Sequence, residues 1–203
     1  MQRFEVLECK RIHFVQKSWR NVLNICANDA ILNYKQKLNN KQDFLQRNTS
    51  MNKWDKRFME LTYQVATWSS CFREGRQIGA IIVKDNRILT TGYNGAPQGV
   101  QTCRDKGECM REKLGIPSGT RHELCYAVHA EQNAIIQAAK LGVSLQGATI
   151  YVTHQPCVIC TRMILNSGIK KVIYKNGYPD EFALELFRQS DVEIIKYADL
   201  ENS

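Results

Sequence analysis

The sequence lacks any long hydrophobic run. None of the apolar stretches in its 203 residues approaches the roughly 20 residues that a membrane-spanning helix needs. Charged residues interrupt the first twenty positions, so no apolar segment typical of a signal peptide stands there. We therefore expect neither a membrane protein nor an exported one, and we place the chain in the cytoplasm. In that reducing compartment, the eight cysteines are better interpreted as metal ligands and buried thiols than as disulfides.

A strong excess of charge is also missing from most of the chain. The net charge is +8, but residues 1–50 carry +5 of it and residues 51–203 only +3. A nearly balanced body is not typical of a nucleic-acid groove, so we do not expect a nucleic-acid partner. Apolar residues make up 43% and charged residues 24%, which excludes a wholly disordered or fibrous protein.

Residues 1–50 contain no glycine and no proline, and seven asparagines punctuate them from position 21 onward. We expect this basic segment to be a poorly ordered extension, with one folded domain over residues 51–203. Two interpretations stay open. Either Met51 is the functional start and the extension is an upstream read-in, or the extension is a helical element that packs on a partner.

From Met51 onward, hydrophobic periodicity predicts a regular order of helices and strands. Asp85-Asn86 predicts a two-residue turn between two strands. The closing strand-helix-strand-helix-strand alternation predicts parallel pairing, and hence an α/β fold with a mixed sheet and helices on both faces. The expected helices are 51–70, one ending near Gly142, 157–166 and 180–189, and the expected strands are 77–84, 87–93, 148–153, 171–175 and 192–197.

The pattern Cys157-Val-Ile-Cys160 follows Pro156 directly after a predicted strand. Proline suits the first turn of a helix, so both thiols should share one helical face near its N-terminus. Backbone amides there lower thiol pKa values and favour metal binding. By itself, such a pair is equally typical of a redox site or of half a structural zinc site.

His129-Ala130-Glu131, which opens another predicted helix, decides between these interpretations. His129, Cys157 and Cys160 supply three zinc ligands and leave a fourth position for water, as catalytic zinc sites do. Zinc lowers the pKa of that water toward ~7, and Glu131 is placed to carry its proton to a substrate. This combination is the signature of hydrolytic nucleobase deaminases. The alternative is a structural zinc site beside an incidental glutamate.

Residues 54–197 resemble the zinc-dependent cytidine/deoxycytidylate deaminase family, and within it the deoxycytidylate (dCMP) deaminase branch that includes late-competence operon deaminases of bacteria. The resemblance implies a three-layer α/β/α fold around a five-stranded mixed sheet, a homo-oligomer, and hydrolysis of dCMP to dUMP and ammonia. The stretches that carry it are Gly92-Tyr-Asn-Gly-Ala-Pro97, Gly115-Ile-Pro-Ser-Gly119, His129-Ala-Glu-Gln-Asn-Ala-Ile135 and Gln155-Pro-Cys-Val-Ile-Cys160.

The same resemblance implies roles for residues around the substrate. Asn94 should contact the deoxyribose, and the backbone at Ala130 and Cys157 should hold the cytosine. Tyr178 occupies a position where the family places an aromatic residue beside the substrate, although core packing is the alternative. His154 is expected near the zinc without binding it.

Five further soft ligands surround the irregular loop before the His129 helix, and a loop with few apolar residues needs a metal to fold. The resemblance implies a second, structural zinc there. We favour Cys71, Cys103, His122 and Cys125 as its ligands, with Cys109 as a fifth candidate; the alternative is unligated thiols. Two residues more than in many members separate Cys71 from Gly79.

Many dCMP deaminases respond to deoxynucleoside triphosphates through a basic residue beyond the His-Ala-Glu motif, and Lys140 holds that position. Its alternative role is to stabilise a helix end. The whole chain has two alternative functions. A tRNA adenosine deaminase would have Leu-Glu before Pro-Cys where this chain has His154-Gln155. An accessory protein of DNA uptake, with secondary or vestigial deaminase activity, is the other.

Overall fold

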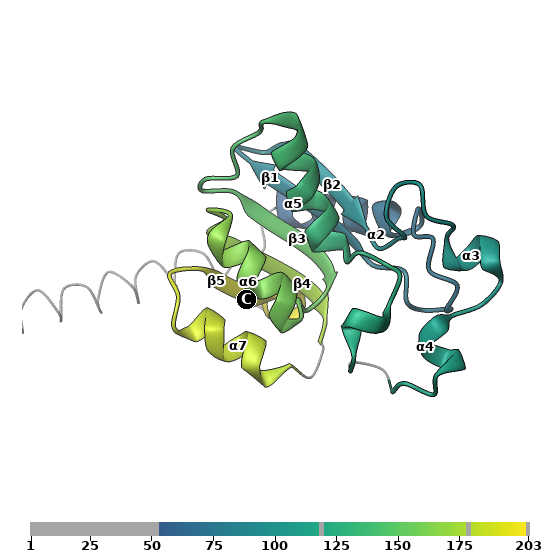
Figure 1. Ribbon diagram of the computed structural model, residues 1–203. Coiled ribbons are helices and arrows are strands. Elements are labelled where there is room, and N and C mark those ends of the chain that lie inside the picture. Colours follow the sequence, from purple (N-terminus) through teal and green to yellow (C-terminus); the bar gives the residue numbers. More distant parts are fainter. Residues whose placement is uncertain (1–52, 118–119, 178–179, 202–203) are drawn as a thin grey trace, which may run out of the picture. The chain divides into compact units, whose positions relative to one another are not determined.

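The computed structural model describes residues 53–117, 120–177 and 180–201 (Figure 1). In this part of the chain, five strands form one sheet in the order β2-β1-β3-β4-β5. They are β1 (Gly79–Lys84), β2 (Arg87–Tyr93), β3 (Thr149–His154), β4 (Lys171–Asn176) and β5 (Glu193–Lys196). β1 is antiparallel to both β2 and β3, whereas β3, β4 and β5 are parallel. The predicted hairpin and mixed sheet are therefore confirmed.

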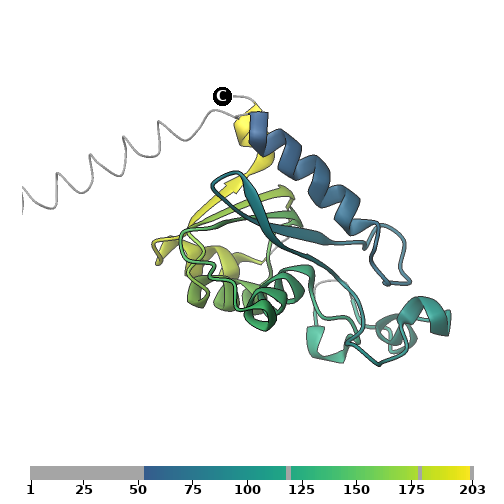
Figure 2. The same ribbon diagram turned by 90° about the horizontal axis from the view of Figure 1, so that it is seen from above.

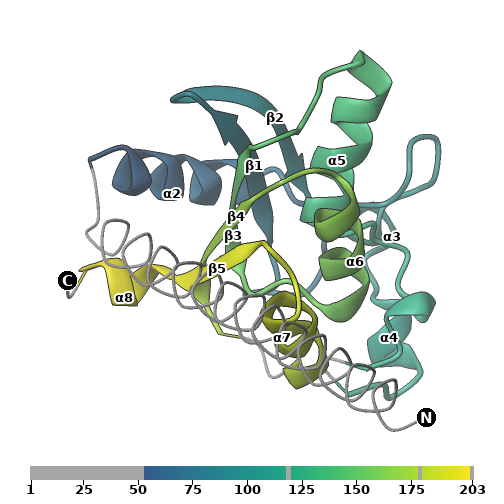
Figure 3. The ribbon, with the colours of Figure 1, turned by 90° about the vertical axis from the view of Figure 1, so that its left-hand side faces the viewer.

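Helices cover both faces of this sheet, as Figure 3 shows. They are α2 (Lys53–Ala66), α3 (Cys103–Lys106), α4 (Met110–Lys113), the 3-10 helix η1 (His122–Leu124), α5 (Ala130–Leu141), α6 (Val158–Asn166), α7 (Glu181–Arg188) and α8 (Tyr197–Glu201). α5, α6 and α7 contribute to the hydrophobic core on one face, and α2 and α8 to the core on the other. Seen from above, α2 (blue) and α8 (yellow) lie on the same side (Figure 2). The three-layer α/β/α fold is confirmed.

The alternation of side chains along the strands produces these two cores. Ile150 and Val152 of β3 pack on the α5 side, while Tyr151 between them packs on the α2 side. Successive strand residues point to opposite faces, and both faces are covered, so the central strands are apolar throughout. This explains why the strands appear in the sequence as continuous β-branched runs.

Local signals set the ends of several elements. Asp85 and Asn86 both have positive φ (51° and 58°), the conformation that a tight two-residue hairpin turn uses. Gly142 caps α5 in the left-handed conformation, with φ of 67°. Thr102 and Asp105 form a reciprocal capping box that starts α3.

Several expectations about elements and their boundaries were wrong. The first helix ends at Ala66 rather than near residue 70. The last strand ends at Lys196 instead of 197, because Tyr197 and Leu200, three residues apart, bury together beneath α2 as a helical turn. Between β2 and η1, where no helix or strand was predicted, the chain forms the short helices α3 and α4, which are too short for hydrophobic periodicity to reveal.

The predicted extension 1–50, its boundary at Met51 and Tyr178 lie outside the described residues. Within the ranges that are described, no helix combines the length and apolar character required to cross a membrane.

Candidate active site

The N-terminal ends of α5 and α6 meet at one edge of the sheet. His129 is the N-cap of α5 and Cys157 is the N-cap of α6, so each stands just before the first helical turn. Helix α6 begins at Val158, one residue later than expected, and Pro156 therefore precedes the N-cap instead of lying in the first turn. Ligands commonly bind at such an edge, beyond the carboxyl ends of the strands of an α/β sheet.

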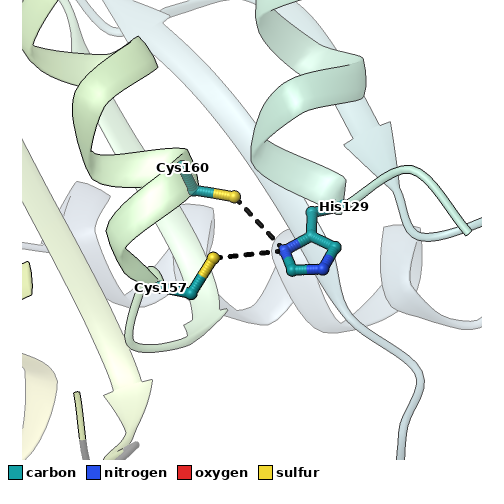
Figure 4. Close-up of side chains that lie close together, drawn as sticks. All are labelled: His129, Cys157 and Cys160. Carbon is teal, nitrogen blue, oxygen red and sulfur yellow. Dashed lines mark hydrogen bonds between the residues drawn. The ribbon is translucent and has the colours of Figure 1, made fainter. Parts of the chain in front are cut away.

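His129, Cys157 and Cys160 bring their ligand atoms together (Figure 4). The Nδ1 of His129 lies 3.5 Å from Sγ of Cys157 and 3.3 Å from Sγ of Cys160. A tetrahedral zinc ion with ordinary Zn–N and Zn–S bonds spaces such ligand atoms about 3.6 Å apart. In the described ranges, no other group of three His, Cys, Asp or Glu side chains brings its ligand atoms within 4.8 Å of one another. The predicted catalytic ligands therefore fit zinc.

The two thiols of this group have different proton affinities. A hydrogen bond from the Cys160 thiol lowers the pKa of Cys157 to about 4, against the opposing effect of burial, and the neighbouring His129 adds to the lowering. The same hydrogen bond, together with burial, raises the pKa of Cys160. One thiolate is thus available to a metal at neutral pH without further deprotonation.

Glu131 lies in the first turn of α5 and is only 4% exposed. Burial raises the pKa of its carboxyl group above the usual range, although the nearby His129 opposes this shift. A carboxyl group with a raised pKa both accepts and releases a proton near neutral pH more readily than an exposed one. Glu131 is therefore suited to general acid-base work beside the metal ligands.

Two polar side chains orient the ligand-bearing helix ends. The Oε1 of Gln132 accepts a hydrogen bond from the backbone N–H of His129 at 3.0 Å. Asp180 accepts one from Val158 N–H at 2.8 Å through Oδ2 and one from Ala183 N–H at 2.9 Å through Oδ1, so it joins the starts of α6 and α7. No role was expected for Asp180 from the sequence, although an aspartate at the start of a predicted helix is a usual capping signal.

A cavity of about 140 Å³ opens beside the metal ligands. Within the described residues it is lined by charged and polar side chains, thiols and a few apolar groups. These are Cys71, Arg73, Arg76, Ile78, Asn94, Cys103, Cys109, Arg111, His122, Cys125, Ala127, His129, Ala130, Glu131, His154, Gln155 and Cys157. The candidate substrate residues Asn94 and Ala130 thus face the same space as Glu131.

Most of the Asn94 side chain is engaged with the protein. Its Oδ1 accepts hydrogen bonds from Ile78 N–H at 2.8 Å and from the Ser69 hydroxyl at 2.7 Å. Its Nδ2 donates to the carbonyl oxygen of Arg76 at 2.8 Å. One amide hydrogen remains for a ligand. Asn94 thus also holds the segment before β1 in place, a role that the sequence did not indicate.

The five loop ligands all line this cavity. Burial raises the pKa of Cys71 and of Cys103, and the charges of neighbouring cysteines, Cys109 and Cys125 among them, add to this. His122 places its ring edge-on to His129, with the ring centroids 5.1 Å apart. In the described ranges, no three of these five residues bring their ligand atoms within 4.8 Å of one another.

Lys140 and His154 lie at different distances from the site. Lys140 is exposed in the last turn of α5, about 14 Å along the helix from Glu131. His154 ends β3 and lines the cavity. Burial, together with the positive charge of Arg76, lowers its pKa, so its imidazole is neutral at pH 7.

Residues 52–176 match the family model described as the cytidine and deoxycytidylate deaminase zinc-binding region. The chain belongs to this family. The match includes His129, Glu131, Cys157 and Cys160 together with the whole loop that carries the other cysteines. The family resemblance noted in the sequence is thus confirmed.

Relatives and solved structures agree with this membership. A deoxycytidylate deaminase of Schizosaccharomyces pombe is 34% identical over 164 residues, which are 80% of this chain and 50% of that protein. The chain thus spans half the length of that relative. ComE operon protein 2 of Bacillus subtilis is 39% identical over 142 residues, or 70% of this chain and 69% of that protein. The dCMP deaminase of cyanophage S-TIM5, crystallised with dCMP and dUMP, has 32% identity, a TM-score of 0.59, and coverage of 72% of this chain and 98% of that one.

Proposed function

We propose that this protein catalyses the hydrolytic deamination of dCMP to dUMP and ammonia. The observation that carries the proposal is the buried Glu131, which lines one cavity with His129 and Cys157, two members of the metal-ligand group that Cys160 completes. The dCMP and dUMP bound in the similar cyanophage enzyme support the choice of nucleotide. Zinc held by the three ligands would supply a Lewis acid that makes hydroxide available near pH 7.

The protein's own residues account for the proton transfers. The Glu131 carboxylate takes a proton from the attacking water and passes it to N3 of the cytosine ring while the oxygen adds to C4. It then takes the proton of the new hydroxyl group on C4 and delivers it to the amino group, which leaves as ammonia as the C4–N bond breaks and the C4 carbonyl forms. The backbone at Ala130 and Cys157, which lines the cavity, would hold the edge of the base.

Ammonia release from dCMP, dCTP, deoxycytidine and cytidine tests this proposal on the zinc-loaded full chain. We expect the highest kcat/KM with dCMP, loss of turnover with a chelator and recovery with zinc. Failure of the zinc-loaded protein to deaminate dCMP would overturn it, whichever other substrate it accepts.

We further propose that the loop cysteines bind a second, structural zinc. Four thiols lining one cavity and affecting each other's proton affinity support this. The proposed ligands are Cys71, Cys103, His122 and Cys125, with Cys109 as a fifth candidate. Metal analysis should then find two zinc ions per chain and one after Cys103→Ser or His122→Asn, whereas a loss of one zinc ion after Cys109→Ser would place Cys109 among the ligands. One zinc ion in the unaltered chain would contradict the second site.

The family model begins at residue 52, which supports our proposal that the catalytic domain starts near Met51. A protein that starts at Met51 contains every residue assigned to chemistry. It should equal the full chain in zinc content, solubility and dCMP turnover. Aggregation or lost activity of the shortened protein alone would show that residues 1–50 belong to the working structure.

Regulation and assembly are further proposals from the same family membership. We propose that Lys140 contributes to a deoxynucleoside triphosphate site, because its position in the last turn of α5 keeps it out of the substrate cavity. Lys140→Ala should then lose any response to dCTP or dTTP and keep basal turnover. We also propose that the chain forms a homo-oligomer, which sedimentation tests. We propose that the protein is located in the cytoplasm, which cell fractionation tests.

A further inference from the structure

His154 lies at the substrate cavity, and no step of the proposed reaction uses it. It ends β3 and lines the cavity together with Glu131 and Asn94. Its side chain is half-buried, and it does not belong to the metal-ligand group, so a zinc ion does not account for it. What this imidazole can bind depends on which of its two ring nitrogens carries the proton.

One ring nitrogen of His154 faces the hydroxyl group of Thr153. The Nδ1 atom lies 3.1 Å from Thr153 Oγ1, and the same oxygen accepts a hydrogen bond from the Gly79 N–H at 3.3 Å. Thr153 is fully buried, and among the described residues its hydroxyl hydrogen has no acceptor other than Nδ1. A proton on Nδ1 would leave this buried hydroxyl hydrogen unpaired, which is unfavourable. Nδ1 therefore accepts, and the proton of the neutral ring lies on Nε2.

The imidazole of His154 carries only this one proton at pH 7. Burial, together with the positive charge of Arg76, lowers its pKa. Protonation would also place a second hydrogen on Nδ1, opposite the hydroxyl hydrogen of Thr153. His154 thus presents one uncharged N–H donor.

The Nε2 atom that carries this proton is open to a ligand. Within the described part of the chain it makes no hydrogen bond, and it is not buried. Charged donors such as guanidinium groups suit phosphate oxygens, whereas a single uncharged N–H suits an uncharged oxygen. In dCMP, the pyrimidine O2 and the 3′-hydroxyl of the deoxyribose are such oxygens.

We propose that His154 donates a hydrogen bond from Nε2 to an uncharged oxygen of the bound nucleotide, either the pyrimidine O2 or the 3′-hydroxyl. This inference rests on the proposed deamination of dCMP. It assigns His154 to substrate binding, with Thr153 as a positioning residue that keeps the proton on Nε2. The reaction displaces neither oxygen, so the contact should act on binding more than on the chemical step.

Nitrogen chemical shifts of the zinc-loaded full chain, labelled with ¹⁵N-histidine, test the position of the proton. The His154 signals, identified by their loss in His154→Gln, should show a proton on Nε2 and none on Nδ1. Thr153→Val should weaken this preference, because it removes the hydroxyl group that donates to Nδ1. Thr153→Ser keeps the hydroxyl and is the matched control. A proton on Nδ1 in the unaltered protein would overturn the inference.

Calorimetry with the product dUMP tests the contact without turnover. His154→Phe keeps a flat ring and removes the donor, so the Kd of dUMP should rise roughly 3- to 10-fold. His154→Gln should recover much of this loss, because its side-chain amide keeps an N–H donor.

Two analogues of dUMP identify the contacted oxygen. The 2-thio analogue replaces O2 with a weakly accepting sulfur, and the 2′,3′-dideoxy analogue lacks the 3′-hydroxyl. His154→Phe should leave the Kd of one analogue unchanged, and that analogue lacks the oxygen that His154 contacts. An equal rise for dUMP and both analogues, or no rise for dUMP, would remove His154 from substrate binding.

Kinetics on the unaltered protein keep this inference apart from the proposed function. If the protein fails to deaminate dCMP, the proposed function is wrong, yet a dUMP affinity that depends on the Nε2 proton still supports the His154 contact. If it deaminates dCMP while His154→Phe binds dUMP as tightly as before, the proposed function stands and the inference falls.

Discussion

Gly92 on β2 lies directly against Ala130, the first residue of α5. A Cβ atom at Gly92 would stand 2.1 Å from the Ala130 carbonyl oxygen and 2.5 Å from the backbone nitrogen of Ala134. Only glycine allows a helix to approach a strand this closely. Because His129 and Glu131 flank Ala130, the absence of a side chain at Gly92 sets the position of the catalytic helix end.

Gly92→Ala should therefore damage both stability and catalysis. Overpacking of this kind costs about 1–3 kcal/mol of unfolding free energy or more, because backbone atoms rather than a flexible side chain must move. Denaturant unfolding and dCMP turnover measure the two effects. Gly177→Ala is the matched control, since nothing lies within 4 Å of its added Cβ. A Gly92→Ala protein with unchanged stability would show that α5 shifts freely.

Glu131→Gln should keep zinc at the catalytic site and lose turnover. The substitution preserves the size of the side chain but removes the proton acceptor. We therefore expect kcat to fall by at least ~10²- to 10⁴-fold. Metal analysis and kinetics on the same preparation check both parts. Glu60→Gln, exposed on α2, should leave both unchanged. Near-normal turnover in zinc-loaded Glu131→Gln would remove this residue from the proton pathway.

The pKa of His154 should rise when Arg76 is replaced by alanine. A neighbouring positive charge disfavours the protonated imidazole, so its removal shifts the pKa upward toward the ordinary value of 6.5. Burial, the larger cause of the lowering, remains, and the pKa should stay below 6.5. Titration of the imidazole resonances, assigned with His154→Gln, measures the shift. An unmoved resonance would place the guanidinium elsewhere.

Tyr151→Phe should destabilise the fold without touching the cavity. The Tyr151 hydroxyl donates to Oδ1 of the buried Asp55 at 2.6 Å and joins β3 to α2. Loss of this donor to a buried carboxyl group should cost about 1–3 kcal/mol of unfolding free energy. A double-mutant cycle with Asp55→Asn isolates the pair. Tyr174→Phe on β4 is the control, and equal costs for the two tyrosines would contradict a special role for Tyr151.

Elements with strong local signals could be predicted from the sequence. The alternation of strands and helices after residue 148 predicted the parallel half of the sheet, and Asp85-Asn86 predicted the hairpin. The short helices α3 and α4 could not be foreseen in the same way. Each is a single turn determined by caps and by contacts with the rest of the loop, so no periodic pattern marks it.

The sequence by itself determined the chemistry of the metal group, because His129, Glu131 and the two cysteines of α6 have characteristic types and order. Only the tertiary structure decided which of the other side chains at the cavity already have a partner within the protein. Arg73, Arg76 and Arg111 are the same residue type in the sequence. In the structure, Glu112 forms an ion pair with Arg73, and two backbone carbonyl oxygens accept hydrogen bonds from Arg111. Glu112 lies 39 residues after Arg73 in the chain, whereas Pro117 and Thr120 lie six and nine residues after Arg111. Their distances depend on how the loop packs against the sheet edge, and no local pattern encodes that.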